Sequence, residues 1–307
     1  MNTKIKVVGV GGSGCNAVSR MARCKIKGVE LIAVNTDAQD LIKTRADTKI
    51  RIGRKITKGL GTGMNPEIGR LSAIENRQDI SDVIRGADMV FITCGLGGGT
   101  GSGAAPIIAG LAKQMGILTL AVVTTPFSFE GQVRQRIADQ GLAKLKENVD
   151  TLIAISNNRL LETLDPNVSI LNAFWACDDI LRQAVQGISD LIILPGIINV
   201  DLADVRSIMV NAGTALFGVG RAKDEGRAEK AALAAISSPL LNVSVKGAKG
   251  LLFNVSGGKD ISLIEIDEVA KTITREIKPD AKVIFGAVQD EKLPKGEIKV
   301  TVIATGF

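Results

Sequence analysis

The chain has 307 residues, of which 45% are hydrophobic and 23% charged, with a formal net charge of +6. It contains no histidine, which excludes Ser-His-Asp and Cys-His catalysis as well as HExxH metal sites. No apolar stretch approaches the roughly 20 residues of a membrane span, and no secretory signal opens the sequence, so we expect a cytoplasmic protein without direct membrane insertion.

Residues 1–169 alternate short apolar runs with helical patterns. Strands are expected at residues 4–10, 29–35, 89–94, 117–125 and 151–156. Near-continuous apolar strands that alternate with helices indicate a parallel sheet covered on both faces. In such sheets, ligands bind at the carboxyl ends of the strands. The positive charge lies mainly in this half, but without a dense basic run or interleaved aromatics, so no nucleic-acid partner is expected.

A long helical pattern follows at residues 170–193 and is stopped by Pro195 and Gly196. The remainder indicates a smaller mixed α/β unit, with strands at 213–222, 250–257, 281–288 and 298–306 and helices at 225–237 and 262–276. We therefore expect an α/β fold in which a Rossmann-like parallel-sheet domain (1–169) is joined by a long central helix (170–194) to a mixed domain (195–307).

The first glycine-rich loop is "GVGGSGCN", residues 9–16. Gly9, Gly11 and Gly14 match the GxGxxG pattern, and Asp37 lies near the acidic position of a dinucleotide-binding fold. An NAD(P)-dependent oxidoreductase is therefore an alternative, although a single match of this kind is weak evidence.

A second glycine-rich loop, "GLGGGTGSG" at residues 95–103, also follows an expected strand. It precedes a helical pattern that starts near Ala104, with Pro106 expected in the first helical turn. Two glycine-rich loops at helix N-termini on one edge of a sheet favour a diphosphate or triphosphate ligand. A third loop, "GLGTGMNP" at residues 59–66, could close over a terminal phosphate, and no Walker-type GxxxxGK[ST] motif occurs.

These motifs resemble the tubulin/FtsZ superfamily almost from end to end. "GGGTGSG" (97–103) is similar to its signature loop, and "TTPFSFEGQVR", "AVQGISDLI", "PGIINVDLADVRSIM" and "VTVIATGF" are similar to the FtsZ branch, the prokaryotic cell-division GTPases. The resemblance implies a polymerising cytoskeletal GTPase that assembles head to tail into the protofilaments of the division ring. GTP would then be hydrolysed at the interface between subunits.

The resemblance also assigns residues to parts of a nucleotide. Residues around the phosphates would be Gly11, Gly12, Gly98, Gly99, Thr100 and Gly101, with Thr62 and Gly63 near the terminal phosphate. Thr124, Pro126, Glu130 and Arg134 would lie on the sugar side, and Asn16, Asn157, Phe174 and Asp179 would form the guanine pocket.

An ionised carboxylate suits guanine because it accepts hydrogen bonds from N1–H and from the 2-amino group, which adenine lacks. Asp178 stands beside Asp179, and a helix turns by about 100° per residue, so only one of the two carboxylates can face the base. The sequence leaves open which of them does.

The stretch "GIINVDLADV" contains Asn199, Asp201 and Asp204. On local grounds Asp201 could be a helix N-cap, with Asp204 favoured by the helix dipole. The resemblance implies in addition that this loop enters the nucleotide site of the next subunit. Asp201 and Asp204 would then position and polarise the attacking water, and Asn199 would orient the loop.

The expected cofactors are GTP or GDP, Mg²⁺ held mainly by phosphates and water with no certain protein ligand, and K⁺ or Na⁺. The expected partner is the chain itself, with division-ring regulators and membrane tethers in the family and a mid-cell location. Because the sequence stops at Phe307, just after its last expected strand, we expect the tether-binding tail of the family to be absent. A nucleotide-binding scaffold that assembles without turnover is a further alternative.

Overall fold

The computed structural model describes residues 3–194, 196–238, 245–278, 280–290 and 293–307. Contacts divide the chain into two compact units, residues 1–186 and 187–307. The division falls inside the long helix α9 (Ile170–Ile193), which has the length expected from the sequence. The three-part division at residues 169 and 194 stays a prediction.

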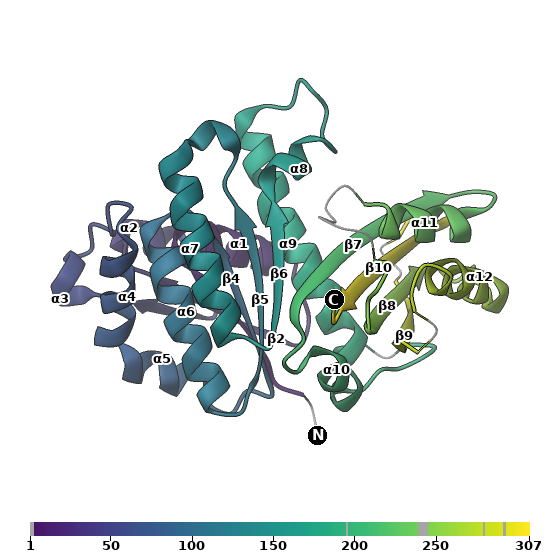
Figure 1. Ribbon diagram of the computed structural model, residues 1–307, viewed down its shortest axis with the longest axis horizontal. Helices are drawn as coiled ribbons and strands as arrows, with labels where there is room; N and C mark the ends of the chain where they lie inside the picture. The colour runs from purple at the N-terminus through teal and green to yellow at the C-terminus, as the bar shows by residue number, and fades with distance from the viewer. Residues whose placement is uncertain (1–2, 195, 239–244, 279, 291–292) are drawn as a thin grey trace. The chain divides into compact units, whose positions relative to one another are not determined.

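The first unit contains a six-stranded sheet in the order β3-β2-β1-β4-β5-β6, and every strand pair in it is parallel (Figure 1). The strands are β1 (Ile5–Val10), β2 (Val29–Asn35), β3 (Thr48–Arg51), β4 (Met89–Gly95), β5 (Leu118–Thr125) and β6 (Thr151–Ser156). Five of them were expected, and the short edge strand β3 was not. The sheet confirms the parallel α/β fold.

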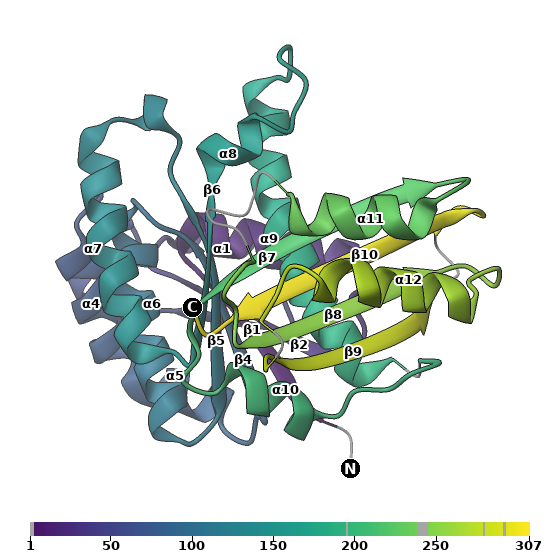
Figure 2. The ribbon, with the colours of Figure 1, turned by 45° about the vertical axis from the view of Figure 1, so that its right-hand side comes forward.

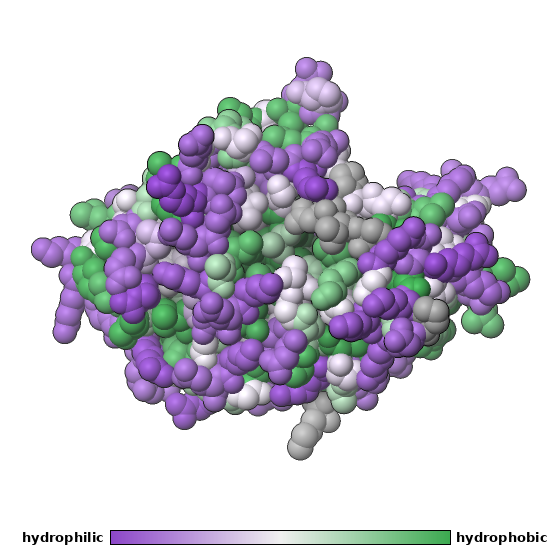
Figure 3. All heavy atoms as spheres, viewed as in Figure 1, coloured by the Kyte–Doolittle hydropathy of each residue, from purple (hydrophilic) through white to green (hydrophobic). Residues whose placement is uncertain are grey.

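Helices cover both faces of this sheet. They are α1 (Gly11–Arg23), α2 (Ala38–Lys43), α3 (Arg54–Thr57), α4 (Pro66–Glu75), α5 (Arg77–Ile84), α6 (Gly99–Gln114), α7 (Gln132–Asn148) and α8 (Asn157–Leu161), with a 3₁₀ turn η1 (Ser128–Glu130). Helices α4, α5, α6 and α7 lie together on one face (Figure 1). The outer surface over α7 is mainly hydrophilic in Figure 3, whereas its inward residues Ala138 and Leu145 join the buried core.

Helix α6 begins five residues earlier than expected, so Pro106 lies inside it rather than in its first turn. The reason is close packing against α4, which the glycines permit. A Cβ at Gly103 would lie 2.0 Å from the Pro66 carbonyl oxygen, and one at Gly69 would lie 2.3 Å from the Gly99 carbonyl oxygen. The glycine-rich loop therefore forms the first turn of the helix itself.

The second unit contains a four-stranded mixed sheet in the order β7-β10-β8-β9, in which only the β8–β9 pair is parallel. Its elements are α10 (Leu202–Met209), β7 (Gly213–Lys223), α11 (Arg227–Ile236), β8 (Gly250–Gly257), α12 (Leu263–Thr274), β9 (Lys282–Gln289) and β10 (Glu297–Thr305). Helices α11 and α12 lie side by side on one face of the sheet (Figure 2). All four strands and both of the helices expected for this part of the chain are confirmed.

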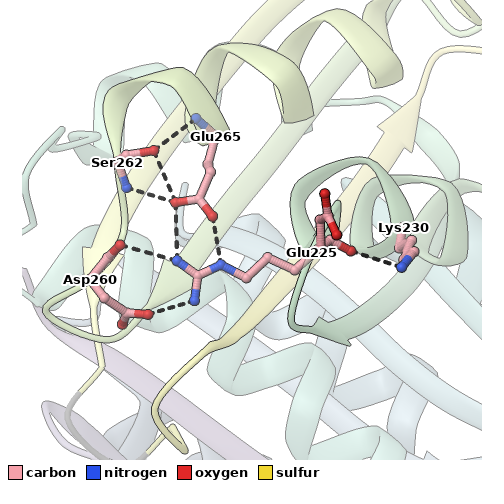
Figure 4. Close-up of polar contacts among 6 residues, drawn as sticks. Glu225, Lys230, Asp260, Ser262 and Glu265 are labelled. Carbon is pink, nitrogen blue, oxygen red and sulfur yellow. Dashed lines mark hydrogen bonds and ion pairs between the residues drawn. The ribbon is translucent and has the colours of Figure 1, made fainter.

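Arg227, at the start of α11, ties this helix to the start of α12. Its guanidinium contacts Asp260 at 2.6 Å and Glu265 at 2.5 Å, and Glu265 also closes a capping box with Ser262 (Figure 4). The Arg227 side chain is only 11% exposed. Hydrogen bonds from Arg227 are the largest influence that lowers the pKa of Glu265, so this carboxylate is ionised in the folded protein.

Replacing Arg227 with alanine is expected to lower the free energy of unfolding by about 2 kcal/mol, because charge-assisted hydrogen bonds to a shielded cation are lost. Urea unfolding of the variant measures this difference. Lys271→Ala is the matched control, since it removes the exposed ion pair with Asp267 and is expected to cost less than about 0.5 kcal/mol. Equal effects of the two substitutions would contradict the interpretation.

Candidate functional site

A cavity of about 280 Å³ opens at the carboxyl ends of the parallel strands of the first unit. Its walls come from the β1–α1, β4–α6 and β5–η1 connections and from α8 and α9. Its lining residues are Val10, Gly11, Gly12, Ser13, Thr62, Met64, Gly95, Leu96, Gly98, Gly99, Thr100, Gly101, Thr124, Pro126, Glu130, Arg134, Asn157, Phe174, Cys177 and Asp178. We call this space the main cavity.

Two helices begin at the main cavity without side-chain caps. Helix α1 starts at Gly11 and α6 at Gly99, and neither has an acidic residue in its first turn. The first N–H groups of a helix have no acceptor within the helix and carry partial positive charge. Two such ends at one cavity form a site for an anion with several oxygens.

The glycines of the two loops serve different purposes. Gly11 has φ +72°, in the left-handed region that favours glycine, and it lets the chain turn from β1 into α1. Gly98 has an ordinary extended backbone, and a Cβ placed on it would meet no protein atom within 4 Å. Packing within the protein therefore does not require glycine at position 98, but a ligand lying against the backbone would.

Hydroxyl groups gather beside the start of α6. The Thr100 Oγ1 lies 2.7 Å from the Thr36 Oγ1 and 3.4 Å from the Thr62 Oγ1. Thr62 belongs to the third glycine-rich loop, so this loop lies against the second one. Gly63, its predicted neighbour at the terminal phosphate, does not line the main cavity.

The turn after β5 forms a side wall of the main cavity. Glu130 accepts a hydrogen bond from the Phe127 backbone N–H at 2.9 Å and forms an ion pair with Arg134 at 3.0 Å. The ring of Phe127 is buried and lies edge-on to Phe174 of α9, with 5.3 Å between ring centroids. Thr124 and Pro126 complete this wall, so all four residues predicted for the sugar side line the cavity.

Two of the four residues predicted for the base, Asn157 of α8 and Phe174 of α9, line the main cavity. Asn157 is 5% exposed, and its Oδ1 has no hydrogen-bond partner among the described residues. Asn16 lines a neighbouring cavity of about 420 Å³ that shares Phe174 and Asp178 with the main one. A buried and unpaired amide oxygen is costly without a partner, so Asn157 is suited to accept a hydrogen bond from a ligand.

Asp178 lines both cavities, whereas Asp179 lines neither. Asp179 instead accepts hydrogen bonds from Arg182 at 2.8 Å and Gln183 at 2.7 Å and pairs with Arg20 at 3.4 Å. The sequence analysis assigned Asp179 to the guanine pocket and named Asp178 as the alternative. Which of the two carboxylates lines the cavity depends on how α9 is rotated about its axis where it packs against α1.

The two carboxyl groups differ in acidity. Burial, together with the charge of Asp179, raises the pKa of Asp178 to about 7, against the opposing charge of Arg20. Burial also acts to raise the pKa of Asp179, but hydrogen bonds and charges from Arg182, Gln183 and Arg20 outweigh it, so that this pKa is lowered.

The three residues predicted to act in hydrolysis lie in the second unit, at the start of α10. Asp201 is the N-cap of α10, and its Oδ1 accepts a hydrogen bond from the Asp204 N–H at 2.7 Å. The Asn199 Oδ1 accepts one from the Gly196 N–H at 2.7 Å. All three side chains are exposed, and none belongs to the lining of the main cavity.

Within the described part of the chain, no three acidic or cysteine side chains are grouped so that they could hold a metal ion. Beside the first turn of α6, the cavity lining contributes the side-chain hydroxyls of Thr62 and Thr100. This donor set fits a divalent cation that is held by the oxygens of a bound nucleotide rather than by a protein cage.

Asp37, which the dinucleotide-binding alternative requires as a ribose ligand, is the N-cap of α2. Its Oδ1 accepts hydrogen bonds from the backbone N–H groups of Gln39 and Asp40, at 2.9 and 3.0 Å. It does not line the main cavity. The sequence analysis did not assign six further lining residues, whose position only the packing of the loops and α9 reveals: Val10, Ser13, Met64, Gly95, Leu96 and Cys177.

Comparison with known families decides between the alternatives. Residues 4–165 match the Tubulin/FtsZ family, GTPase domain, and residues 213–307 match the FtsZ family, C-terminal domain. The chain belongs to the FtsZ family of GTPases. This membership excludes the NAD(P)-dependent oxidoreductase, and it supports binding of GTP or GDP.

Solved structures agree with the family. FtsZ of M. jannaschii, solved as an empty dimer, is 47% identical, with a TM-score of 0.96 over 100% of this chain and 89% of that one. The W319Y mutant of the same FtsZ is also 47% identical, with a TM-score of 0.96 over 99% of this chain and 91% of that one. CetZ2 from Haloferax volcanii shares the fold at 21% identity, with a TM-score of 0.81 over 98% of this chain and 92% of that one.

The helices of this FtsZ-family chain do not include a membrane span among the described residues. None of them combines the length and the apolar character that crossing a bilayer requires.

Proposed function

We propose that this GTPase assembles head to tail into protofilaments and hydrolyses GTP at the contact between subunits, as the cytoskeletal element of a prokaryotic division ring at mid-cell in the cytoplasm. The observation that carries the proposal is the composition of the main cavity. It offers two uncapped helix N-termini for phosphates, and both carboxylates in its lining have other tasks: Glu130 is paired with Arg134, and Asp178 is proposed to bind the base. The group that polarises a water must then come from elsewhere.

Asp201 and Asp204 are the proposed source, supplied by the next subunit. Both carboxylates are exposed in the single chain, and the helix that carries them is well capped. A contact between different faces of identical subunits does not close on itself, so it generates a filament. CetZ2 from Haloferax volcanii, which shares this fold, was solved as a protofilament with GTPγS bound.

Within the site, each part of the chain has a separate task. The N–H groups at the starts of α1 and α6 bind the phosphate oxygens and stabilise charge on them, which is the main contribution that proteins make to phosphoryl transfer. Mg²⁺, when bound to the nucleotide, supplies further charge neutralisation. Asp204 and Asp201 of the adjoining subunit orient the attacking water and accept its proton, and Asn199 holds their loop.

A monovalent cation, K⁺ or Na⁺, is proposed to bind beside the same exposed carboxylates once two subunits meet. The family's division-ring regulators and membrane tethers are proposed as further partners.

The test is the dependence of turnover on protein concentration. Phosphate release from GTP with Mg²⁺ is measured together with light scattering on the same samples. Specific activity near zero below a threshold concentration, rising together with scattering above it, is the expected result. Activity per molecule that is constant on dilution would show that the site is complete within one chain.

Guanine recognition is proposed to depend on Asp178 rather than Asp179, because only Asp178 lines the cavity. Asp178→Asn is expected to weaken GDP binding at least tenfold and to improve binding of xanthosine diphosphate, since an amide donates to the 2-oxo group of xanthine. Calorimetric titration with both nucleotides measures this change. Asp179→Asn is the matched control, and a larger switch in that variant would assign the base to Asp179 instead.

A further inference from the structure

Arg20, on α1, faces the carboxylate pair of α9. Its guanidinium Nε lies 3.4 Å from the Asp179 Oδ1, and its central carbon lies 6.0 Å from the ring centroid of Trp175. Arg20 and Asp178 line the same neighbouring cavity. Neither family resemblance nor motif spacing drew attention to Arg20, because its role depends on a contact between two helices.

The spacing of residues on α1 explains why Arg20 is placed there. Ser13, Asn16 and Arg20 are separated by three and four positions, so they form one stripe along the helix. Ser13 lines the main cavity together with Gly11 and Gly12, while Asn16 and Arg20 line the neighbouring one. One face of α1 therefore runs from the phosphate end of the site to its base end.

On α9, two stripes lie next to each other. Phe174, Cys177 and Asp178 follow the i, i+3, i+4 spacing and line the main cavity. Trp175, Asp179 and Arg182 form the adjoining stripe, and Arg20 contacts its first two members. The Nε groups of Arg20 and Arg182 both contact the Asp179 Oδ1, and this carboxylate does not line the cavity.

We propose that Arg20 is a positioning residue for guanine recognition: by holding Asp179 away from the cavity and placing a positive charge beside Asp178, it keeps Asp178 as the ionised acceptor for the base. This inference rests on the proposed role of Asp178. Arg20 itself acts through the two aspartates and is assigned no direct contact with the nucleotide.

The electrostatic surroundings of Asp178 make the effect measurable. Burial and the Asp179 charge raise the pKa of Asp178 to about 7, while Arg20 opposes the rise. The other ionisable groups lining the two cavities with Asp178 are Arg23 and Cys24 from α1 and its C-cap, Glu130 and Arg134 from η1 and α7, and Cys177 on α9. Burial raises the pKa of the Cys177 thiol to about 12, so this group stays neutral.

The sign of the pH dependence follows from which form binds. Only ionised Asp178 accepts both guanine hydrogen bonds, so GDP affinity falls as the pH drops through the pKa of Asp178 and is constant well above it. Removing Arg20 takes away a charge that favours ionisation. The midpoint of the affinity profile then moves to higher pH.

The experiment is titration calorimetry of GDP binding between pH 6 and pH 8.5 for the whole chain. Arg20→Met is expected to raise the midpoint by about 0.5 to 1 pH unit, which weakens binding about two- to fivefold at pH 7 and leaves it near the original value at pH 8.5. Arg20→Lys keeps the charge and is expected to shift the midpoint less, in the same direction. It carries the test if Arg20→Met does not fold.

Arg85→Met is the matched control. It removes an arginine that forms an ion pair with Asp82 at 3.2 Å. This pair lies on the segment before β4, and hence at the amino ends of the strands, whereas the cavity lies at their carboxyl ends. This control is expected to leave the profile unchanged. A loss of affinity by the same factor at every pH in Arg20→Met would show a merely structural role and overturn the inference, as would an unshifted profile.

The Asp178→Asn variant separates the role of Arg20 from the role of Asp178 on which it rests. If this variant loses the pH step while Arg20→Met leaves the midpoint in place, the inference about Arg20 fails and the role of Asp178 stands. If Asp178→Asn binds GDP with the original profile, Asp178 is not the acceptor and both statements fail together.

Discussion

Replacing Asp204 with asparagine is expected to lower GTP turnover by about 10²- to 10⁴-fold, the usual cost of losing a group that activates water. The fold should tolerate the change, because the cap of α10 is the Asp201 side chain and Asp204 contributes its backbone N–H to it. Phosphate release at a protein concentration well above the assembly threshold measures the effect. GDP affinity in dilute solution, unchanged from the original chain, is the control that separates chemistry from binding.

A mixture of variants tests whether the site is shared between subunits. The Gly98→Val variant has an intact Asp204 but a blocked cavity. The Asp204→Asn variant has an open cavity but no carboxylate at position 204. In a head-to-tail filament with random mixing, about a quarter of the contacts combine a working cavity with a working Asp204, so the mixture should recover activity that neither variant has alone. A mixture as inactive as its components would place Asp204 outside a neighbour's site.

Gly98→Val is itself expected to weaken GTP and GDP binding at least 100-fold without destabilising the protein. A Cβ at Gly98 meets no protein atom within 4 Å, and the backbone there is extended, so the free chain accommodates a side chain. The new methyl groups occupy the space that phosphate oxygens need at the start of α6. Calorimetric titration with GDP and urea unfolding without nucleotide measure the two halves of this prediction.

Gly103→Ala, on the same helix, is expected to lower stability, unlike Gly98→Val. Its added Cβ would lie 2.0 Å from the Pro66 carbonyl oxygen, so α4 and α6 must move apart, which costs about 1 to 3 kcal/mol of stability. A Gly98→Val variant that loses stability in the same way as Gly103→Ala would show that Gly98 is required for packing rather than for the ligand.

The sequence by itself determined the class of fold and the two glycine-rich loops of the cavity through local patterns, and its resemblance to the family named most of the other lining residues. The apolar runs at residues 29–35 and 117–125 predict buried parallel strands, and the strands lie there. Glycine-rich loops after β1 and β4 predict helix N-termini at one edge of the sheet, and Gly11, Gly99 and Thr100 line the cavity found there. The edge strand β3 was missed since four residues with one buried side chain carry little periodic signal.

Only the tertiary structure decided questions that depend on contacts between distant segments. The early start of α6 follows from the packing of Gly103 against α4 rather than from local propensity. Which of Asp178 and Asp179 lines the cavity depends on the packing of α9 against α1, where Arg20, a residue more than 150 positions earlier, pairs with Asp179. Rotation of a helix about its axis depends on its neighbours, and a linear pattern read from the helix alone does not contain it.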